Sequence, residues 1–280
     1  MKIGLVDAGG GFRGIYGWAV QDYCLEHEIY FDYCIGVSAG SANLISYMAR
    51  QKGRNIPFYG EYGFRKEYCS VSNFLRDGNY LNLNYVYGTL SNSDGEYPLD
   101  YQAIVDNPAE YYAVATNAVT GKVFYFDRSY LSQDHYEIVM ASSALPGACH
   151  PVKIGDNLYF DGGFGDPVPV QKALDDGCDK VVLILTKTRD TIRKPGADNL
   201  GVNMIRHRYP EAAKQLSLRY KKYNDAVVLA KEYEKQGKVL IISPESTLGM
   251  TTLKRSQEQL DQMYQMGLED AKVIPEFLAR

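Results

Sequence analysis

The pattern of apolar and polar residues predicts alternating strands and helices at the start of the chain. An apolar run over residues 2–7 ends in glycines, and residues 14–27 follow with apolar side chains at helical spacing. A second β-like run over residues 30–37 leads into a helix that continues to about Gln51. This β-α-β-α order favours a parallel sheet covered by helices.

The rest of the chain divides into an irregular middle and a regular second half. Residues 53–101 are rich in Tyr, Asn, Gly and Ser with weak periodicity, so we interpret them as an insertion or cap. Beyond them the pattern predicts strands at 111–117, 122–126, 152–154, 157–160, 180–185 and 239–242, and helices at 134–143, 208–236 and 251–279. We expect a single three-layer α/β/α domain over residues 1–280, with a mainly parallel central sheet and C-terminal helices at about 208–280.

Composition narrows the classes of function. The 280 residues carry a net charge of -4, so no global cationic field draws in nucleic acid. The five cysteines are odd in number and lack C-x-x-C pairs, which predicts reduced thiols in a cytoplasmic protein without a metal site. No apolar run approaches the ~20 residues that span a bilayer. We therefore expect peripheral membrane contact at most, and no cofactor.

Ser38 is the first candidate for chemistry. It lies in Gly36-Val37-Ser38-Ala39-Gly40, which fits the G-x-S-x-G nucleophile elbow, a tight strand-to-helix turn that presents a serine hydroxyl. Glycines on both sides let the chain segments approach without a Cβ clash. The pattern alone is common by chance, but here it follows a predicted strand and opens a predicted helix.

A glycine run one strand earlier has two interpretations. In Gly9-Gly10-Gly11-Phe12-Arg13-Gly14, backbone N–H groups can converge to form an oxyanion hole for acyl transfer. The same run fits the G-x-G-x-x-G dinucleotide fingerprint, with Asp32 about twenty residues on as the ribose ligand. The glycine-flanked serine favours acyl hydrolysis, because a dinucleotide site does not require it.

A serine hydroxyl also needs a base. We interpret His27 and His135 as exposed polar residues and His150 as a turn residue. Asp161 ends a β-like run and is followed by Gly162-Gly163, which leaves its carboxylate at a strand terminus. Its ordinary pKa makes it a weak base unless burial raises that pKa. A Ser38-Asp161-His207 triad remains an alternative, because these residues occur in the chain order of α/β-hydrolases.

Together, the three segments resemble the patatin-like phospholipase family over roughly residues 3–185. Ala115-Thr116-Asn117 and the run from Ala141 to Pro146 are also similar to bacterial members. The chain departs from many members at Ala8, where they carry an acidic residue or glycine, and some carry alanine where it has Gly163.

The resemblance implies a Ser-Asp dyad. It assigns Ser38 as the nucleophile and Asp161 as its base, with Gly9, Gly10 and Gly11 as the oxyanion hole. Arg13 matches the basic position of the family's glycine loop, and Gly14, Gly36, Gly40, Gly162 and Gly163 complete the motifs. The implied activity is hydrolysis of lipid esters, of the phospholipase A or lysophospholipase kind. A non-lipid carboxylesterase of the same mechanism is the alternative.

Two further segments bear on the substrate. Residues 206–222 carry six basic residues against one acid, which is typical of a solvated helix face or of a surface that contacts anionic lipid headgroups. The Tyr-rich segment 53–101 can shape an acyl pocket, pack as an ordinary insertion or form an oligomer contact. The expected partner is therefore an acyl lipid or ester substrate.

Overall fold

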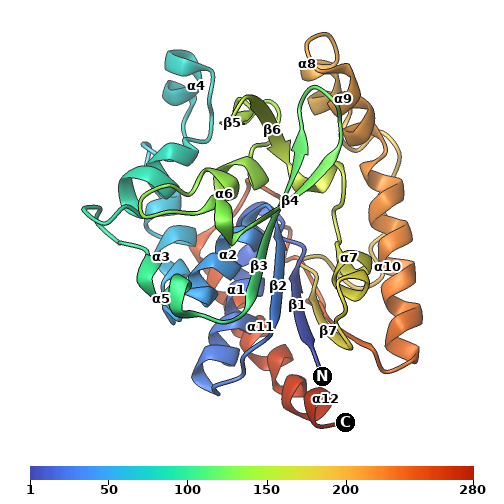
Figure 1. The fold of residues 1–280 in the computed structure, drawn as a ribbon. Coiled ribbons are helices and arrows are strands. Elements are labelled where there is room, and N and C mark those ends of the chain that lie inside the picture. Colours follow the sequence, from blue (N-terminus) through green and yellow to red (C-terminus); the bar gives the residue numbers. More distant parts are fainter.

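An eight-stranded, mostly parallel sheet forms the middle layer of the computed structural model, which describes residues 1–280 (Figure 1). The strand order is β5-β6-β3-β2-β1-β7-β8, with β4 paired to β3. The pairs among β3, β2, β1, β7 and β8 are parallel, whereas β4 and β6 are antiparallel to β3 and β5 is antiparallel to β6. The strands are β1 (Ile3–Asp7), β2 (Tyr33–Val37), β3 (Glu110–Asn117), β4 (Val123–Asp127), β5 (Val152–Ile154), β6 (Asn157–Asp161), β7 (Lys180–Ile184) and β8 (Val239–Ile242).

Helices cover both faces of this sheet, so the expected three-layer α/β/α arrangement is confirmed. Leu5 packs into the core of one face and its neighbour Val6 into the core of the other, because successive strand side chains point to opposite sides. One face is covered by α1 (Gly14–Glu26), α2 (Ala39–Met48), α5 (Tyr101–Asp106), α6 (Glu137–Ser142), α11 (Gln257–Asp270) and α12 (Ile274–Ala279), the other by α7 (Val170–Asp175) and α10 (Arg219–Lys235).

The C-terminal elements complete this architecture. β8 extends the parallel sheet beyond β7, and α11 packs along α1 so closely that a Cβ on Gly267 would lie 2.5 Å from the Tyr16 carbonyl oxygen. The region predicted as one helix over 208–236 is two, α9 (Pro210–Ser217) and α10. The helix predicted from residue 251 begins only at Gln257, because the Ser256 side chain caps it by accepting from the Gln259 N–H at 3.2 Å.

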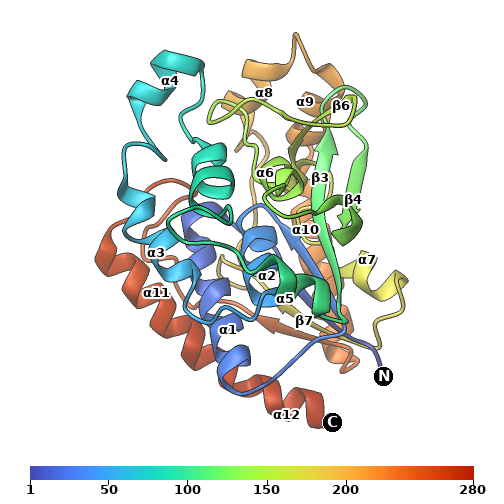
Figure 2. The same cartoon turned by 60° about the vertical axis from the view of Figure 1, so that its left-hand side comes forward.

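Residues 53–101 fold as short helices beside α2 and α6 rather than as strands (Figure 2). Leu81 and Leu83 anchor this insertion by packing against Ala144 and Ala148. The helical pieces are α3 (Asn55–Tyr59), α4 (Val71–Asp77), a 3₁₀ turn at Tyr62–Phe64 and a π-helical turn at Tyr85–Leu90. Mixed short turns of this kind explain why the segment has weak periodicity.

The parallel topology brings three loops to one edge of the sheet. The glycine loop follows β1, Ser38 follows β2, and the segment from Leu185 to Asp198 follows β7, so all three leave the carboxyl ends of adjacent strands. This edge is where open α/β sheets bind ligands. The remaining helix, α8 (Asn199–Ile205), lies at the same end of the molecule as α4 (Figure 1). None of the helices has both the length and the apolar composition needed to cross a bilayer.

Candidate active site

Ser38 occupies a strained turn between β2 and α2. Its φ of 57° and ψ of -131° lie in a region that non-glycine residues rarely adopt. A Cβ on Gly36 would lie 2.5 Å from the Ser41 nitrogen, and one on Gly40 would lie 2.3 Å from the Asp7 carbonyl oxygen. The two flanking glycines are therefore required by close backbone contacts, which is the local geometry of a nucleophile elbow.

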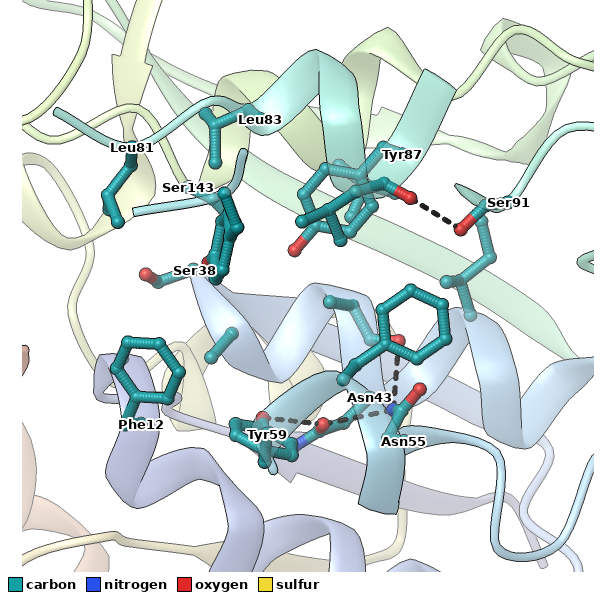
Figure 3. Close-up of a pocket in the computed structure, with 18 of the residues that line it drawn as sticks. Phe12, Ser38, Asn43, Asn55, Tyr59, Leu81, Leu83, Tyr87, Ser91 and Ser143 are labelled. Atoms are coloured by element: carbon teal, nitrogen blue, oxygen red, sulfur yellow. Dashed lines mark hydrogen bonds between the residues drawn. The ribbon is translucent and has the colours of Figure 1, made fainter. Parts of the chain in front are cut away.

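Hydrogen bonds hold the Ser38 backbone and leave its side chain free. The Ser38 N–H donates to the Ser142 hydroxyl at 2.9 Å, and the Ser41 hydroxyl donates to the Ser38 carbonyl at 2.7 Å. Ser38 is only 8% exposed, and Figure 3 shows it beside Ser143 at the edge of a pocket. The turn thus holds a sheltered hydroxyl in a fixed place.

The glycine loop lies directly against this turn. Gly9, Gly10 and Gly11 all have positive φ values, of 63°, 138° and 61°. A Cβ on Gly9 would lie 2.0 Å from the Val37 carbonyl oxygen. The N–H groups of Gly10 and Gly11 have no acceptor, but the Gly9 N–H donates to Asp7 Oδ1 at 2.9 Å. Gly9, predicted as part of the oxyanion hole, thus already donates its N–H to Asp7, and the close contact with Val37 explains why this position needs a glycine.

Asp7 is a site residue that the sequence reasoning missed. Its fully buried carboxylate accepts from the Gly9 N–H and also from Gln21 Nε2 at 2.8 Å and Asn43 Nδ2 at 3.1 Å. Burial raises its pKa to about 6 despite these donors. One side chain thereby ties the glycine loop to α1 and α2. Its position at the end of β1, two residues before the glycine run, was the available signal.

Asp161 is brought to Ser38 by the sheet, although 123 positions separate them in the chain. It ends β6 opposite Ala115 of β3, and β3 pairs in turn with β2, the strand that Ser38 follows. Gly162 is needed there because a Cβ would lie 2.2 Å from the Val114 carbonyl oxygen. A Cβ on Gly163 would lie 2.9 Å from Asp161 Oδ1 and 3.0 Å from Arg219 Nη2.

The Asp161 carboxylate is fully buried and only half satisfied. The Gly163 N–H donates to Oδ1 at 2.7 Å, whereas Oδ2 has no hydrogen-bond partner. Burial raises the pKa of Asp161, and the Arg219 guanidinium and then the Ser38 hydroxyl lower it. The Ser38 hydroxyl is thus near enough to the carboxylate to stabilise its charged form. The raised pKa makes Asp161 a stronger base than an exposed aspartate.

The other predicted motif residues pack around this pair. Arg13 is buried, and its Nη1 donates weakly to the Met250 carbonyl at 3.5 Å. A Cβ on Gly14 would lie 2.4 Å from the Tyr59 hydroxyl oxygen, so the start of α1 also needs a glycine. The five cysteines form no disulfide, and no three metal-ligating side chains gather at one point.

The structure contradicts two of the alternatives. All four histidines are exposed, and His207 contacts neither Ser38 nor Asp161, so the Ser-Asp-His triad is not assembled. Asp32 precedes β2 and accepts from the Ile3 N–H at 2.7 Å, at the amino end of the strands. The glycine loop is at their carboxyl end, so Asp32 is on the wrong edge to contact a ribose bound there.

A mainly apolar pocket opens next to Ser38 (Figure 3). It holds about 860 Å³ of empty space, part of it open to solvent, and 16 of its 24 lining residues are hydrophobic. At its base Asn43 Oδ1 accepts from the Tyr59 hydroxyl at 2.8 Å and from Asn55 Nδ2 at 3.1 Å. The walls come from distant parts of the chain, among them Phe12, Ala42, Leu81, Leu83, Val139, Thr252 and Leu253. A concave, mainly apolar lining with a few polar groups is the usual form of a ligand site.

Comparisons with known proteins agree with this geometry. A family model described as "Patatin-like phospholipase" matches residues 5–174, and one described as "Domain of unknown function (DUF6363)" matches residues 209–278. VipD from Legionella pneumophila, a solved structure, has a TM-score of 0.50 at 16% identity, covering 98% of this chain and 67% of VipD. That similarity concerns the fold alone.

Curated relatives match about two thirds of the chain. The protein of Escherichia coli (strain K12) named "Uncharacterized protein YjjU" is 30% identical over 188 residues, covering 66% of this chain and 52% of YjjU. "Lysophospholipase NTE1" of Meyerozyma guilliermondii is 25% identical over 183 residues, covering 65% of this chain and 12% of that protein. The chain thus spans about half of the one and about an eighth of the other. With its family model matched over more than half of its residues, the chain belongs to the patatin-like phospholipase family.

Proposed function

We propose that the chain is a serine acyl hydrolase that cleaves carboxylic ester bonds of lipids through a Ser38–Asp161 dyad. The observation that carries the proposal is a strained, sheltered serine beside a buried carboxylate with one unpartnered oxygen, at the edge of an apolar pocket. The family and the lysophospholipase relative support lipid esters as the substrate class.

The reaction divides into two steps. Ser38 Oγ attacks the ester carbonyl carbon while its proton moves to Asp161 Oδ2, and the same proton then leaves on the alcohol as an acyl-enzyme forms. A water molecule next gives a proton to Asp161 and attacks the acyl carbon, and Asp161 passes that proton to Ser38 Oγ as the fatty acid leaves. The raised pKa of Asp161 brings its basicity closer to what both transfers need.

The free N–H groups of Gly10 and Gly11 are the donors for the tetrahedral oxyanion in this mechanism. They follow Gly9, which packs against the Ser38 turn, and Gly11 lines the same pocket as Ser38. Loss of one such donor typically costs about 10²–10³ in kcat.

The apolar pocket is our proposed site for the acyl chain. Thr252 and Leu253, which line it, come from the C-terminal region, so we also infer that residues 1–280 act as one domain. Exposed apolar side chains on α4 and α8 at the same end of the molecule support peripheral contact with a lipid surface (Figure 1): Phe74, Leu75, Leu200 and Met204.

A covalent probe tests the proposal most directly. We expect a fluorophosphonate to label the protein at Ser38, and Ser38→Ala to abolish both labelling and hydrolysis of a short-chain aryl ester. Ser217→Ala is the matched control, because this exposed serine only bonds its own helix. Labelling that survives in Ser38→Ala would show that the nucleophile is elsewhere.

The alternative is a carboxylesterase of non-lipid substrates. A lipid panel compared between wild type and Ser38→Ala distinguishes the two: fatty acid released only by wild type supports the lipid hydrolase. Hydrolysis of the aryl ester, with no fatty acid released from any lipid, would instead support the carboxylesterase.

A further inference from the structure

Four basic side chains next to the dyad have no part in the mechanism above. This cationic cluster consists of Arg13, Lys187, Arg193 and Arg219. Arg13 ends the glycine loop, Lys187 and Arg193 lie in the segment after β7, and Arg219 begins α10. Residues from three distant segments therefore place like charges together, which is unfavourable unless something compensates.

Protein acceptors for these cations are too few. Arg193 Nη2 binds both carboxylate oxygens of Asp198, at 2.8 and 3.0 Å, and Arg219 Nη1 reaches the same carboxylate at 3.7 Å. Arg13 donates only to a backbone carbonyl, and Lys187 makes neither a hydrogen bond nor an ion pair. Asp198 and the nearby Asp161 are the acids that face the cluster, so positive charge exceeds negative charge.

Several donors in the cluster are both buried and unused. The Nε atoms of Arg13, Arg193 and Arg219 are buried without a hydrogen-bond partner. Burial, together with repulsion from neighbouring cations, lowers the pKa of Arg13 to about 10 and that of Lys187 to about 8. Unused donors that coincide with an excess of cations over acids destabilise a fold, so this combination indicates a place for an anion.

The cluster borders both the glycine loop and the turn that follows Asp161. Nη2 of Arg13 lies 3.4 Å from the position of a Cβ on Gly10, and Nη2 of Arg219 lies 3.0 Å from that of a Cβ on Gly163. None of the four cations lines the apolar pocket. A ligand held at Ser38 would therefore have an apolar surface in one direction and a cationic one in another.

We propose that the cationic cluster binds a phosphate group next to Ser38. A phosphate carries up to two negative charges and accepts from several donors at once, which suits guanidinium and ammonium groups in excess. A single carboxylate would leave more of the cluster's charge uncompensated. The contacts above support anion binding by themselves. Use of the site by a substrate rests on the proposed function.

Two sources can supply this group: the headgroup of a phosphorylated lipid substrate, or free phosphate that acts as an effector. In the first case the phosphate and the scissile ester belong to one molecule, with its acyl chain in the pocket. In the second case the anion occupies the cluster whichever ester is being hydrolysed.

Thermal unfolding tests the site without relying on activity. We expect inorganic phosphate to raise the Tm of wild type and of Ser38→Ala by a few degrees above potassium chloride at equal ionic strength. Lys187→Gln should lose at least half of that increase, because Lys187 binds nothing else. Lys194→Gln, an exposed lysine on the same segment, is the matched control and should behave as wild type. Equal Tm values in phosphate and chloride, or equal phosphate effects in all variants, would overturn the proposal.

Hydrolysis then identifies the source. For a headgroup site, kcat/KM for a 1-acylglycerol 3-phosphate should exceed that for the monoacylglycerol of the same chain by about tenfold, and Lys187→Gln should reduce this ratio severalfold. For an effector site the ratio is near one, and inorganic phosphate changes monoacylglycerol hydrolysis in wild type but not in Lys187→Gln. If no ester is hydrolysed while phosphate still raises the Tm, the proposed function fails and the anion site stands.

Discussion

The apolar pocket and the cationic cluster both adjoin Ser38, but the protein offers their cations different numbers of hydrogen-bond acceptors. Arg54, the cation that lines the pocket, is 4% exposed and donates to Ser46, Ser91 and the Tyr97 carbonyl. Lys187 in the cluster has no such acceptor. The pocket's cation therefore serves to fasten the insertion, whereas the cluster's cations remain available to a ligand.

This difference shows how a cation that stabilises the fold can be distinguished from one that is available to bind a ligand. Arg54 donates three hydrogen bonds within its own chain through Nη1 and Nη2 and lies over the ring of Phe58 at 4.6 Å, so it is stabilised without a ligand. In the cluster one carboxylate, Asp198, serves two arginines. The pocket therefore holds a single cation with its own acceptors, whereas the cluster holds four cations that share Asp198 and Asp161.

Asp161→Asn should have the largest effect, because both regions depend on the dyad. The amide keeps the shape of the side chain but cannot take the Ser38 proton, so we expect kcat/KM to fall roughly 10²–10⁴-fold. Esters with and without a phosphate should lose activity equally in a steady-state assay. Asp166→Asn is the control, since this half-buried carboxylate accepts from Tyr125 at 2.8 Å. Unequal losses would mean that Asp161 acts on the cluster rather than on Ser38.

Asp7→Asn should change how stability depends on pH. The pKa of Asp7 is raised from 3.8 to about 6 in the folded state, so the folded protein binds more protons than the unfolded chain between these values. Stability contributed by protonated Asp7 is therefore lost as pH rises through about 6, by about 3 kcal/mol in total.

Urea unfolding of wild type and variant at pH 4 and pH 7 measures this effect. The pH-dependent loss should be smaller in Asp7→Asn by most of that amount, and unchanged in Asp94→Asn, an exposed control. Asp7 ties the glycine loop to both α1 and α2. The result therefore tests the glycine loop, which borders both the pocket and the cluster. Identical pH dependence in all three proteins would contradict the role of Asp7.

Leu83→Trp should have the smallest effect, and one confined to the pocket. The larger ring fills space beside Ser38, so kcat/KM for a long-chain ester should fall about 10–200-fold relative to an acetyl ester. Hydrolysis of a chain-length series measures the ratio. Val228→Trp, on the exposed face of α10, should leave it unchanged. A lower preference for phosphorylated substrates in Leu83→Trp would show that the pocket and cluster are not separate.

Much of the sheet could be predicted from the sequence, because strands buried on both faces give continuous apolar runs, as in β1 and β7. Ser38 could be found for a related reason: a glycine-flanked turn leaves its pattern in consecutive residues. The insertion was recognised by its composition alone, since short helical turns such as Tyr85–Leu90 have no lasting period. Which N–H groups of the glycine loop are free could not be predicted, because nothing in the glycine run indicates that Asp7 accepts from the Gly9 N–H.

What the sequence by itself determined is local: the elbow at Ser38, the glycine loop and the Asp161 turn, each dictated by backbone geometry within a few residues. Only the tertiary structure decided which distant groups meet. Sheet pairing brings Asp161 to Ser38, and the loop after β7 and the start of α10 bring Lys187 and Arg219 beside Arg13. Charge–charge and desolvation energies depend on distance and burial in space, and neither is fixed by separation along the chain.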